Sequence, residues 1–107
     1  MRYLESKIQK EIVRAIKYML PKSVIWSTPN EGKRNVRFAS VLKDNGLLNG
    51  VSDLICINNG KIYFLEVKTE KGKQTEYQKE FQNKIESQGF QYHVVKSVQD
   101  ALKIINQ

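Results

Sequence analysis

The first twenty residues carry apolar side chains at helical spacing. Charged residues fill the positions between them, and Pro21 follows the last of them. Apolar residues three and four positions apart form one stripe along a helix, and proline ends a helix. The pattern therefore predicts an amphipathic helix from about Tyr3 to Leu20, with an inward stripe made of Ile8, Ile12, Ala15, Ile16 and Met19.

Residues 23–69 alternate between short apolar segments and polar ones. The apolar segment 23–27 predicts a strand, the polar and basic segment 28–37 a loop, and residues 38–43 a short helix. Two further strand-like segments, residues 51–57 and 61–69, are joined through Asn58, Asn59 and Gly60. This arrangement is typical of a β-hairpin.

The turn residues predict the register of this hairpin. Asn-Gly is a favoured pair for a two-residue turn, so Asn59 and Gly60 are expected at its tip. Asp53 then lies directly opposite Glu66, and Lys68 lies on the same face two positions further along. A three-residue loop would shift this register by one.

The hairpin is apolar on both faces. We therefore expect both faces to be covered and the hairpin to be central in its sheet. One face carries core positions below the polar end, at Ile55, Ile57, Ile62 and Phe64, and the other carries Leu54, Cys56, Tyr63, Leu65 and Val67.

The remaining residues complete an α/β pattern. Thr75 and Gln78 form the T-x-x-Q pattern of a capping box, which predicts a helix from Thr75 to about Gln88. A strand over residues 90–96 and a last helix after Ser97 follow. The sequence thus predicts an α/β fold with a small mixed central sheet flanked by helices, in one domain over residues 1–107.

The two carboxylates at the polar end of the hairpin need a partner. Asp53 and Glu66 would repel each other, and one would be protonated near neutral pH unless a cation lay between them. Oxygen ligands suit Mg²⁺, and a lysine beside the ion can orient or deprotonate water or stabilise negative charge. The set indicates phosphodiester hydrolysis; the alternative is a salt bridge between Lys68 and one of the two acids at the end of the sheet.

Composition and charge narrow the class of partner. The chain has 18 basic and 11 acidic residues and a net charge of +7, which favours a polyanion, although such a charge can also serve solubility alone. No apolar segment is long enough to span a membrane, and the charged N-terminus does not resemble a signal peptide. Cys56 is the one cysteine, which excludes an internal disulfide and fits a reducing, cytoplasmic location.

Four segments together carry a resemblance to a known family. They are P-N-E-G-K-R at 29–34, L-K-D-N-G-L-L-N-G-V-S-D at 42–53, F-L-E-V-K-T at 64–69 and K-G-K-Q-T-E-Y-Q at 71–78. In order and spacing they resemble the VRR-NUC (virus-type replication-repair nuclease) family of the PD-(D/E)xK nuclease superfamily. The resemblance extends from the first helix to the C-terminus.

The resemblance implies roles for particular residues. Asp53, Glu66 and the backbone carbonyl of Val67 would bind the metal, and Lys68 would be the catalytic lysine. Gln78 matches a glutamine near the active site, a role that can coexist with its place in the capping box. The implied cofactor is Mg²⁺ or Mn²⁺.

The family also places a glutamate of the first helix beside the metal, and this chain offers Glu5 and Glu11. At about 100° per residue, Glu5 lies roughly 35° from the centre of the inward stripe and Glu11 roughly 85°. Glu5 is therefore the expected ligand, directly or through a water; the alternative is a solvated acid in the first turn. The family usually has proline where this chain has Ser52, a departure that removes no chemistry.

Basic and polar residues flank the expected active end. Trp26 is interpreted as a core or interface residue rather than a base-stacking platform. Each basic residue alone could be a solvated surface charge, but as a group they are candidates for phosphate contacts. These nucleic-acid-binding candidates are Asn30, Lys33, Arg34, Arg37, Lys71 and Lys73.

The function expected from the residues and the resemblance together is a metal-dependent DNA endonuclease. Short members of the family look like structure-selective phage or bacterial nucleases similar to Holliday-junction resolvases, so we expect a homodimer acting on branched DNA during replication, repair or recombination. The reaction would use activated water without a covalent intermediate. The alternatives are a nuclease for flaps or single strands and a non-catalytic nucleic-acid-binding module.

Overall fold

The structure is a computed structural model, which describes residues 2–28 and 36–106, with side chains for residues 4–28 and 40–106. The predicted order of helices and strands is confirmed, with ends that differ by a few residues. Along the chain the elements are α1 (Arg2–Met19), β1 (Val24–Ser27), α2 (Val36–Asp44), β2 (Leu54–Asn58), β3 (Lys61–Val67), α3 (Glu76–Ser87), β4 (Gln91–Val95) and α4 (Val98–Ile105).

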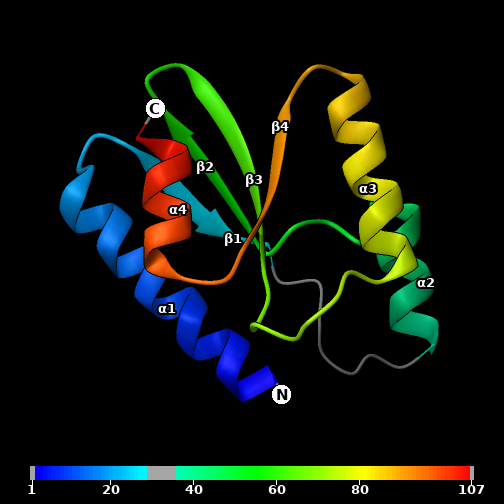
Figure 1. The fold of residues 1–107 in the computed structure, drawn as a ribbon. Helices are drawn as coiled ribbons and strands as arrows, with labels where there is room; N and C mark the ends of the chain where they lie inside the picture. Colours follow the sequence, from blue (N-terminus) through cyan, green and yellow to red (C-terminus); the bar gives the residue numbers. More distant parts are fainter. Residues whose placement is uncertain (1, 29–35, 107) are drawn as a thin grey trace.

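The four strands form one small mixed sheet in the order β1-β2-β3-β4 (Figure 1). The pairs β1–β2 and β2–β3 are antiparallel, and β4 runs parallel to β3 after the crossover through α3. The hairpin of β2 and β3 is therefore central, as predicted. The α/β class with a small mixed sheet flanked by helices is confirmed.

The register of the central hairpin also agrees with the prediction. Leu54 pairs with Leu65 and Ile57 with Ile62. Asn59 and Gly60 form the turn with φ angles of 53° and 77°, the left-handed conformation that a type I′ turn requires. Asp53 and Glu66 are the next residues beyond the last ladder pair, so they meet at the same end of the hairpin.

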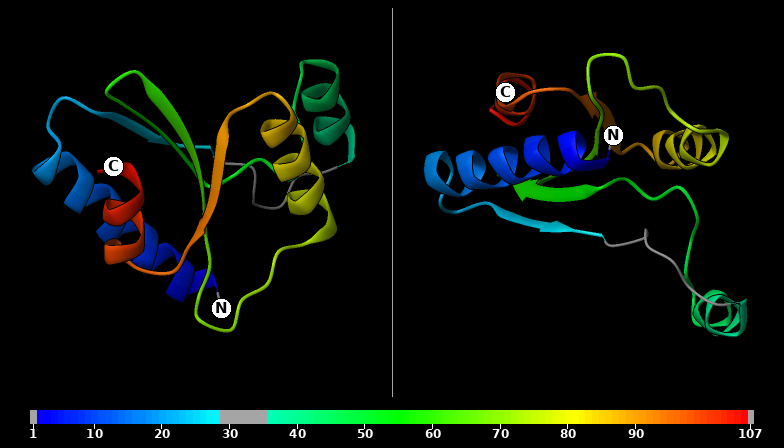
Figure 2. Two further views of the ribbon diagram at one scale, coloured as in Figure 1. Left: turned by 45° about the horizontal axis from the view of Figure 1, so that its top comes forward. Right: turned by 90° about the horizontal axis from the view of Figure 1, so that it is seen from below.

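One face of the sheet packs against α1 and α4, which lie side by side on it (Figures 1 and 2). Alternate residues of β2 and β3 point into this layer, where Leu54, Cys56 and Leu65 are fully buried. The helices contribute their apolar stripes, and burial of such side chains is the main favourable term in folding. The buried helical residues are Ile12, Ile16, Ala101 and Ile105.

The other face of the sheet is less covered than the sequence suggested. Ile55, Ile57, Ile62 and Phe64 were expected in the core, but they are only half-buried. Helix α3 covers the end of this face near Phe64, whose ring lies 5.8 Å from that of Phe81. Because both faces of the hairpin are apolar, the residue pattern could not show that α1 and α4 pack on the same side.

The first strand leaves apolar side chains on this open face. Val24 pairs with Ile57 and Trp26 with Ile55, and the two β1 side chains are 55% and 42% exposed. Trp26 is therefore not a core residue. None of the helices in the described part of the chain is both long and apolar enough to cross a membrane.

The predicted capping box opens α3. The Thr75 side chain accepts a hydrogen bond from the Gln78 backbone N–H, and the Gln78 side-chain oxygen accepts one from the Thr75 N–H at 2.8 Å. These two bonds satisfy donors that the first turn of a helix otherwise leaves open. The same bonds fix the Gln78 side chain near the sheet.

Candidate active site

Asp53 is held where β2 begins. Its backbone carbonyl accepts a hydrogen bond from the Thr28 N–H at 3.0 Å, which extends the β1–β2 pairing by one residue. Its carboxylate oxygen Oδ2 accepts a hydrogen bond from the Val67 N–H at 2.8 Å. The side chain of Asp53 therefore reaches across the hairpin to the end of β3.

Glu66 lies on β3 beside this carboxylate and is 1% exposed. Its oxygen Oε2 accepts a hydrogen bond from Gln78 Nε2 at 2.8 Å and lies 3.7 Å from Lys68 Nζ. Its other oxygen, Oε1, is buried without a hydrogen-bond partner among the described residues. A buried carboxylate oxygen left in this way is costly unless a ligand meets it.

The surroundings of Glu66 disfavour its negative charge. Burial, and after it the Asp53 carboxylate, raise the pKa of Glu66 to about 9, while the Lys68 ammonium acts in the opposite direction. Glu5 adds a smaller contribution that also raises this pKa. Without a cation the pair is therefore expected to hold a proton at neutral pH, and a divalent ion would let both carboxylates ionise.

The structure brings Asp53, Glu66, Lys68 and Gln78 together. Lys68 is itself 7% exposed, and its backbone N–H donates to the Val95 carbonyl at 3.0 Å, so β4 fixes the position of the lysine. Gln78 comes from α3 and contacts Glu66 directly. The donors that face the carboxylate pair are the Lys68 ammonium, the Gln78 amide and the Val67 N–H, and among the described residues Glu66 Oε1 is left without a donor.

These groups fit a hard divalent cation. Asp53 and Glu66 supply oxygen, the buried Glu66 Oε1 is without a donor among the described residues, and the Val67 carbonyl lies next to Glu66 in the chain. Mg²⁺ binds through one or two carboxylates and keeps waters for the rest of its shell. Among the described residues, no cluster of three or more His, Cys, Asp or Glu side chains comes close enough to form a closed metal cage.

The structure separates the two glutamates of α1. Glu5 is half-buried and close enough to Glu66 to influence its pKa, whereas Glu11 is exposed on the outer side of the helix. Glu5 is therefore the α1 glutamate that influences the site, although among the described residues it does not join Asp53 and Glu66 in a three-acid cluster.

The predicted phosphate contacts are only partly within the described residues. Lys71 and Lys73 are exposed in the loop that leaves β3 toward α3. Asn30, Lys33 and Arg34, together with the side chain of Arg37, lie outside the described residues.

Two features beside the site were not predicted. Gly50, with φ of +81°, lies so close to α3 that a Cβ atom there would be 2.2 Å from the Tyr77 carbonyl oxygen. Tyr92 is buried near Glu66, and its hydroxyl accepts a hydrogen bond from Gln74 Nε2 at 3.2 Å. The alternation of residues 90–96 could have been used to place Tyr92 on the same face of the sheet as Glu66. The close packing of Gly50 against Tyr77 could not be predicted from any local sequence pattern.

Comparison with known proteins identifies the domain. The family model of the VRR-NUC domain matches residues 5–99. The chain belongs to the VRR-NUC family. Two solved structures named as a VRR_NUC domain and a VRR_NUC domain protein are both 22% identical to it, with TM-scores of 0.67 and 0.77. The first likeness covers 97% of this chain and 96% of the other, and the second 96% and 85%.

At this identity the two VRR-NUC structures show a shared fold. Curated proteins gave no match to the chain. A VRR-NUC domain is a nuclease-type domain, so its substrate is a nucleic acid. The resemblance seen in the sequence is therefore confirmed for the family and the fold.

Proposed function

We propose that this VRR-NUC domain is a metal-dependent DNA endonuclease that cuts branched DNA in the manner of a Holliday-junction resolvase. The observation that carries the proposal is the buried Glu66 oxygen without a donor among the described residues, in a cluster with Asp53, Lys68 and Gln78. A purely structural salt bridge would be expected to leave no such oxygen. Roles in phage or bacterial replication, repair or recombination, in the cytoplasm, belong to the same proposal.

Asp53, Glu66 and the Val67 carbonyl would hold Mg²⁺ or Mn²⁺, and Glu5, which forms no three-acid cluster with Asp53 and Glu66, would take part through a water. When bound, the ion activates a water molecule and neutralises charge on the phosphate. Lys68 Nζ, 3.7 Å from Glu66 Oε2, would orient or deprotonate the attacking water or stabilise the developing negative charge. Gln78 would hold the Glu66 carboxylate in place, because its amide donates to Oε2.

The charge of the chain supports a DNA substrate. With a net charge of +7, neutralising phosphates releases counterions and favours binding. Lys71 and Lys73 are exposed in the loop directly after the catalytic strand, where they can contact the backbone of the substrate. A homodimer would match the near two-fold symmetry of a four-way junction.

A cleavage assay with end-labelled DNA tests the proposal. Four-way junctions, flaps and single strands are incubated with Mg²⁺, Mn²⁺ or EDTA, using the wild type, Lys68→Ala and the matched surface control Lys103→Ala. We expect metal-dependent cutting that falls at least about 100-fold in Lys68→Ala, the typical loss on removing one group that stabilises transition-state charge. Lys103→Ala should cut as the wild type does.

The same assay separates the rival functions. If flaps or single strands are cut in preference to junctions, they are the substrate, and the resolvase-like part of the proposal is wrong. Binding of DNA without metal-dependent, Lys68-dependent cutting would overturn the enzyme and favour a non-catalytic binding module.

A further inference from the structure

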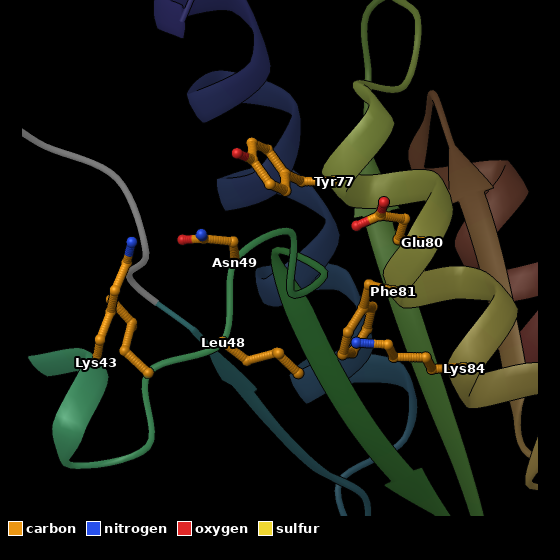
Figure 3. A pocket seen from close by; sticks show the side chains of 8 residues that line it. Lys43, Leu48, Asn49, Tyr77, Glu80, Phe81 and Lys84 are labelled. Carbon is orange, nitrogen blue, oxygen red and sulfur yellow. The ribbon is translucent and has the colours of Figure 1, made fainter.

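A cleft beside the candidate active site has no role in the proposed cleavage chemistry. It lies between α3 and the segment that leads from α2 to β2, and it has a volume of about 360 Å³ (Figure 3). A volume of this size is at the lower end of the range of small-molecule sites and is sufficient for one nucleobase with part of its sugar.

The apolar part of the cleft is aromatic and fixed. Phe81, which is buried, lies at its base and packs edge-on against Phe64 and Tyr92, with ring centres 5.8 and 6.0 Å away. Leu48 reaches in from the segment before β2, and Tyr77 stands on the first turn of α3 with 60% of its surface exposed (Figure 3). The exposed Tyr77 ring, next to the buried Phe81 ring at the floor of the cleft, offers a surface on which a flat ring can stack.

The polar part of the cleft suits a nucleotide. Lys43 and Lys84 place cations on opposite walls, where they can meet the phosphates on either side of a base. Asn49 can donate to and accept from the edge of a base, and the Glu80 carboxylate can accept from an amino or imino N–H. A purely apolar ligand would leave these four groups unused.

The cleft is joined to the active site through the backbone. The segment that carries Asn49 packs on α3 at Gly50, where any side chain would strike the Tyr77 carbonyl and the Gln78 N–H. Gln78 in turn contacts Glu66, and Asp53 follows three residues after Gly50. A nucleotide in the cleft is therefore positioned relative to the carboxylate pair by a short, closely packed connection.

We propose that this cleft binds one unpaired nucleobase of the DNA substrate, stacked on Tyr77, next to the phosphate that is cut. The inference rests on the proposed nuclease function and gives it a physical basis for structure selectivity. A base can enter the cleft only after it has left the helix stack, which costs less at a branch point, where the stack is interrupted, than inside a continuous duplex. Duplex DNA without such a base would be a poorer substrate.

A fluorescence experiment tests binding without relying on cleavage. 2-Aminopurine is placed in turn at each nucleotide around the branch point of a junction, and the DNA is titrated with the Lys68→Ala protein so that it stays intact. We expect a large change in fluorescence at one position, because the base there exchanges its quenching neighbours in the DNA stack for Tyr77. Adding Tyr77→Phe should preserve this change, and adding Tyr77→Ala should abolish it, while adding Tyr18→Ala, at another exposed helical tyrosine, should not affect it.

A cleavage cycle tests the link to catalysis. Removing the base at the position where the fluorescence changes, or changing Tyr77 to Ala, should each lower kcat/KM about tenfold, and the two together should lower it no further. The atoms of α3 nearest to a Cβ at Gly50 belong to the backbone of Tyr77 and Gln78, and truncating the Tyr77 side chain leaves these atoms in place.

The outcomes are distinct. A fluorescence change that survives Tyr77→Ala, or losses that multiply in the combined experiment, would overturn the cleft as a base site while leaving the nuclease intact. Absence of Lys68-dependent cutting would overturn the nuclease, and the fluorescence result would still decide whether the cleft binds a base.

Discussion

At the residue scale, the two oxygens of Glu66 have different surroundings. The Gln78 amide and the Lys68 ammonium both approach Oε2, and Oε1 is buried without a donor among the described residues. The side chain is thus held by one oxygen while the other remains available to a ligand. Such an arrangement stabilises the protein less than a fully hydrogen-bonded carboxylate would. The stability of the fold therefore depends on whether a proton or a cation binds at Oε1.

The first prediction is that the metal-free protein loses stability as the pH rises. The pKa of Glu66 is raised from 4.5 to about 9 in the folded state, so folded Glu66 binds its proton more tightly than unfolded Glu66. This contribution is fully present below pH 4.5 and is lost as the pH rises through 9, with a slope of at most about 1.4 kcal/mol per pH unit. Urea unfolding in EDTA between pH 5 and pH 8 measures it.

The matched variant for this prediction is Glu66→Gln, which keeps the shape of the side chain and cannot ionise. It should show a much flatter pH dependence than the wild type. Mg²⁺ should raise the Tm of the wild type at pH 8 and leave that of Glu66→Gln nearly unchanged. An equal slope in both proteins would show that Glu66 is not the group whose titration controls stability.

At the scale of elements, the first turn of α3 connects folding to the site. Gln78 uses its oxygen to cap the helix and its nitrogen to hold Glu66, so one side chain serves two purposes. The helix start is a local feature, and the contact with Glu66 depends on how α3 packs on β3. The position of α3 therefore controls the position of the carboxylate.

Two variants separate these purposes. Thr75→Ala removes the cap and should cost about 1 kcal/mol of stability while leaving cleavage close to that of the wild type. Gln78→Glu keeps an acceptor for the Thr75 N–H but replaces the donor to Glu66 by a negative charge. It should reduce cleavage about tenfold or more with a smaller change in Tm, as measured by kinetics and thermal unfolding. The reverse ranking of the two variants would show that Gln78 acts only as a cap.

Much of this architecture could be predicted from local signals. Asn59-Gly60 defined the hairpin, and its register placed Asp53 beside Glu66; Thr75 defined the start of α3. Long-range packing could not be predicted in the same way. Nothing near Gly50 in the sequence shows that α3 will approach it, and the apolar residues on both sides of the hairpin do not show which side the helices cover.

At the scale of the whole molecule, the two faces of the sheet differ. One is covered by α1 and α4, and part of the other exposes Val24 and Trp26 beside half-buried Ile55 and Ile57. These strand positions carry no charge in a chain of net charge +7. Burial of such apolar side chains favours association, so this face is the surface that we propose for the homodimer, with Lys10, Arg14 and Lys17 of α1 at its edge beside Trp26.

Sedimentation velocity tests the dimer. Trp26→Glu introduces a charge into the proposed interface and should shift the protein from dimer to monomer at micromolar concentration. Tyr18→Glu, at a tyrosine that is 84% exposed on α1, should leave the mass unchanged. A wild type that sediments as a monomer, or a dimer unaffected by Trp26→Glu, would remove this surface from the proposal.

The two-residue turn at Asn59 and Gly60 stands at the far end of the hairpin from the carboxylates, about 20 Å away at the rise of a β-strand. Successive strand residues point to opposite faces of the sheet. A change at the turn that shifts the pairing of β2 and β3 by an odd number of residues would therefore place Asp53 and Glu66 on opposite faces. Insertions at this turn are therefore compatible with the site only if the loop accommodates them without changing the register, or if they shift the register by an even number of residues.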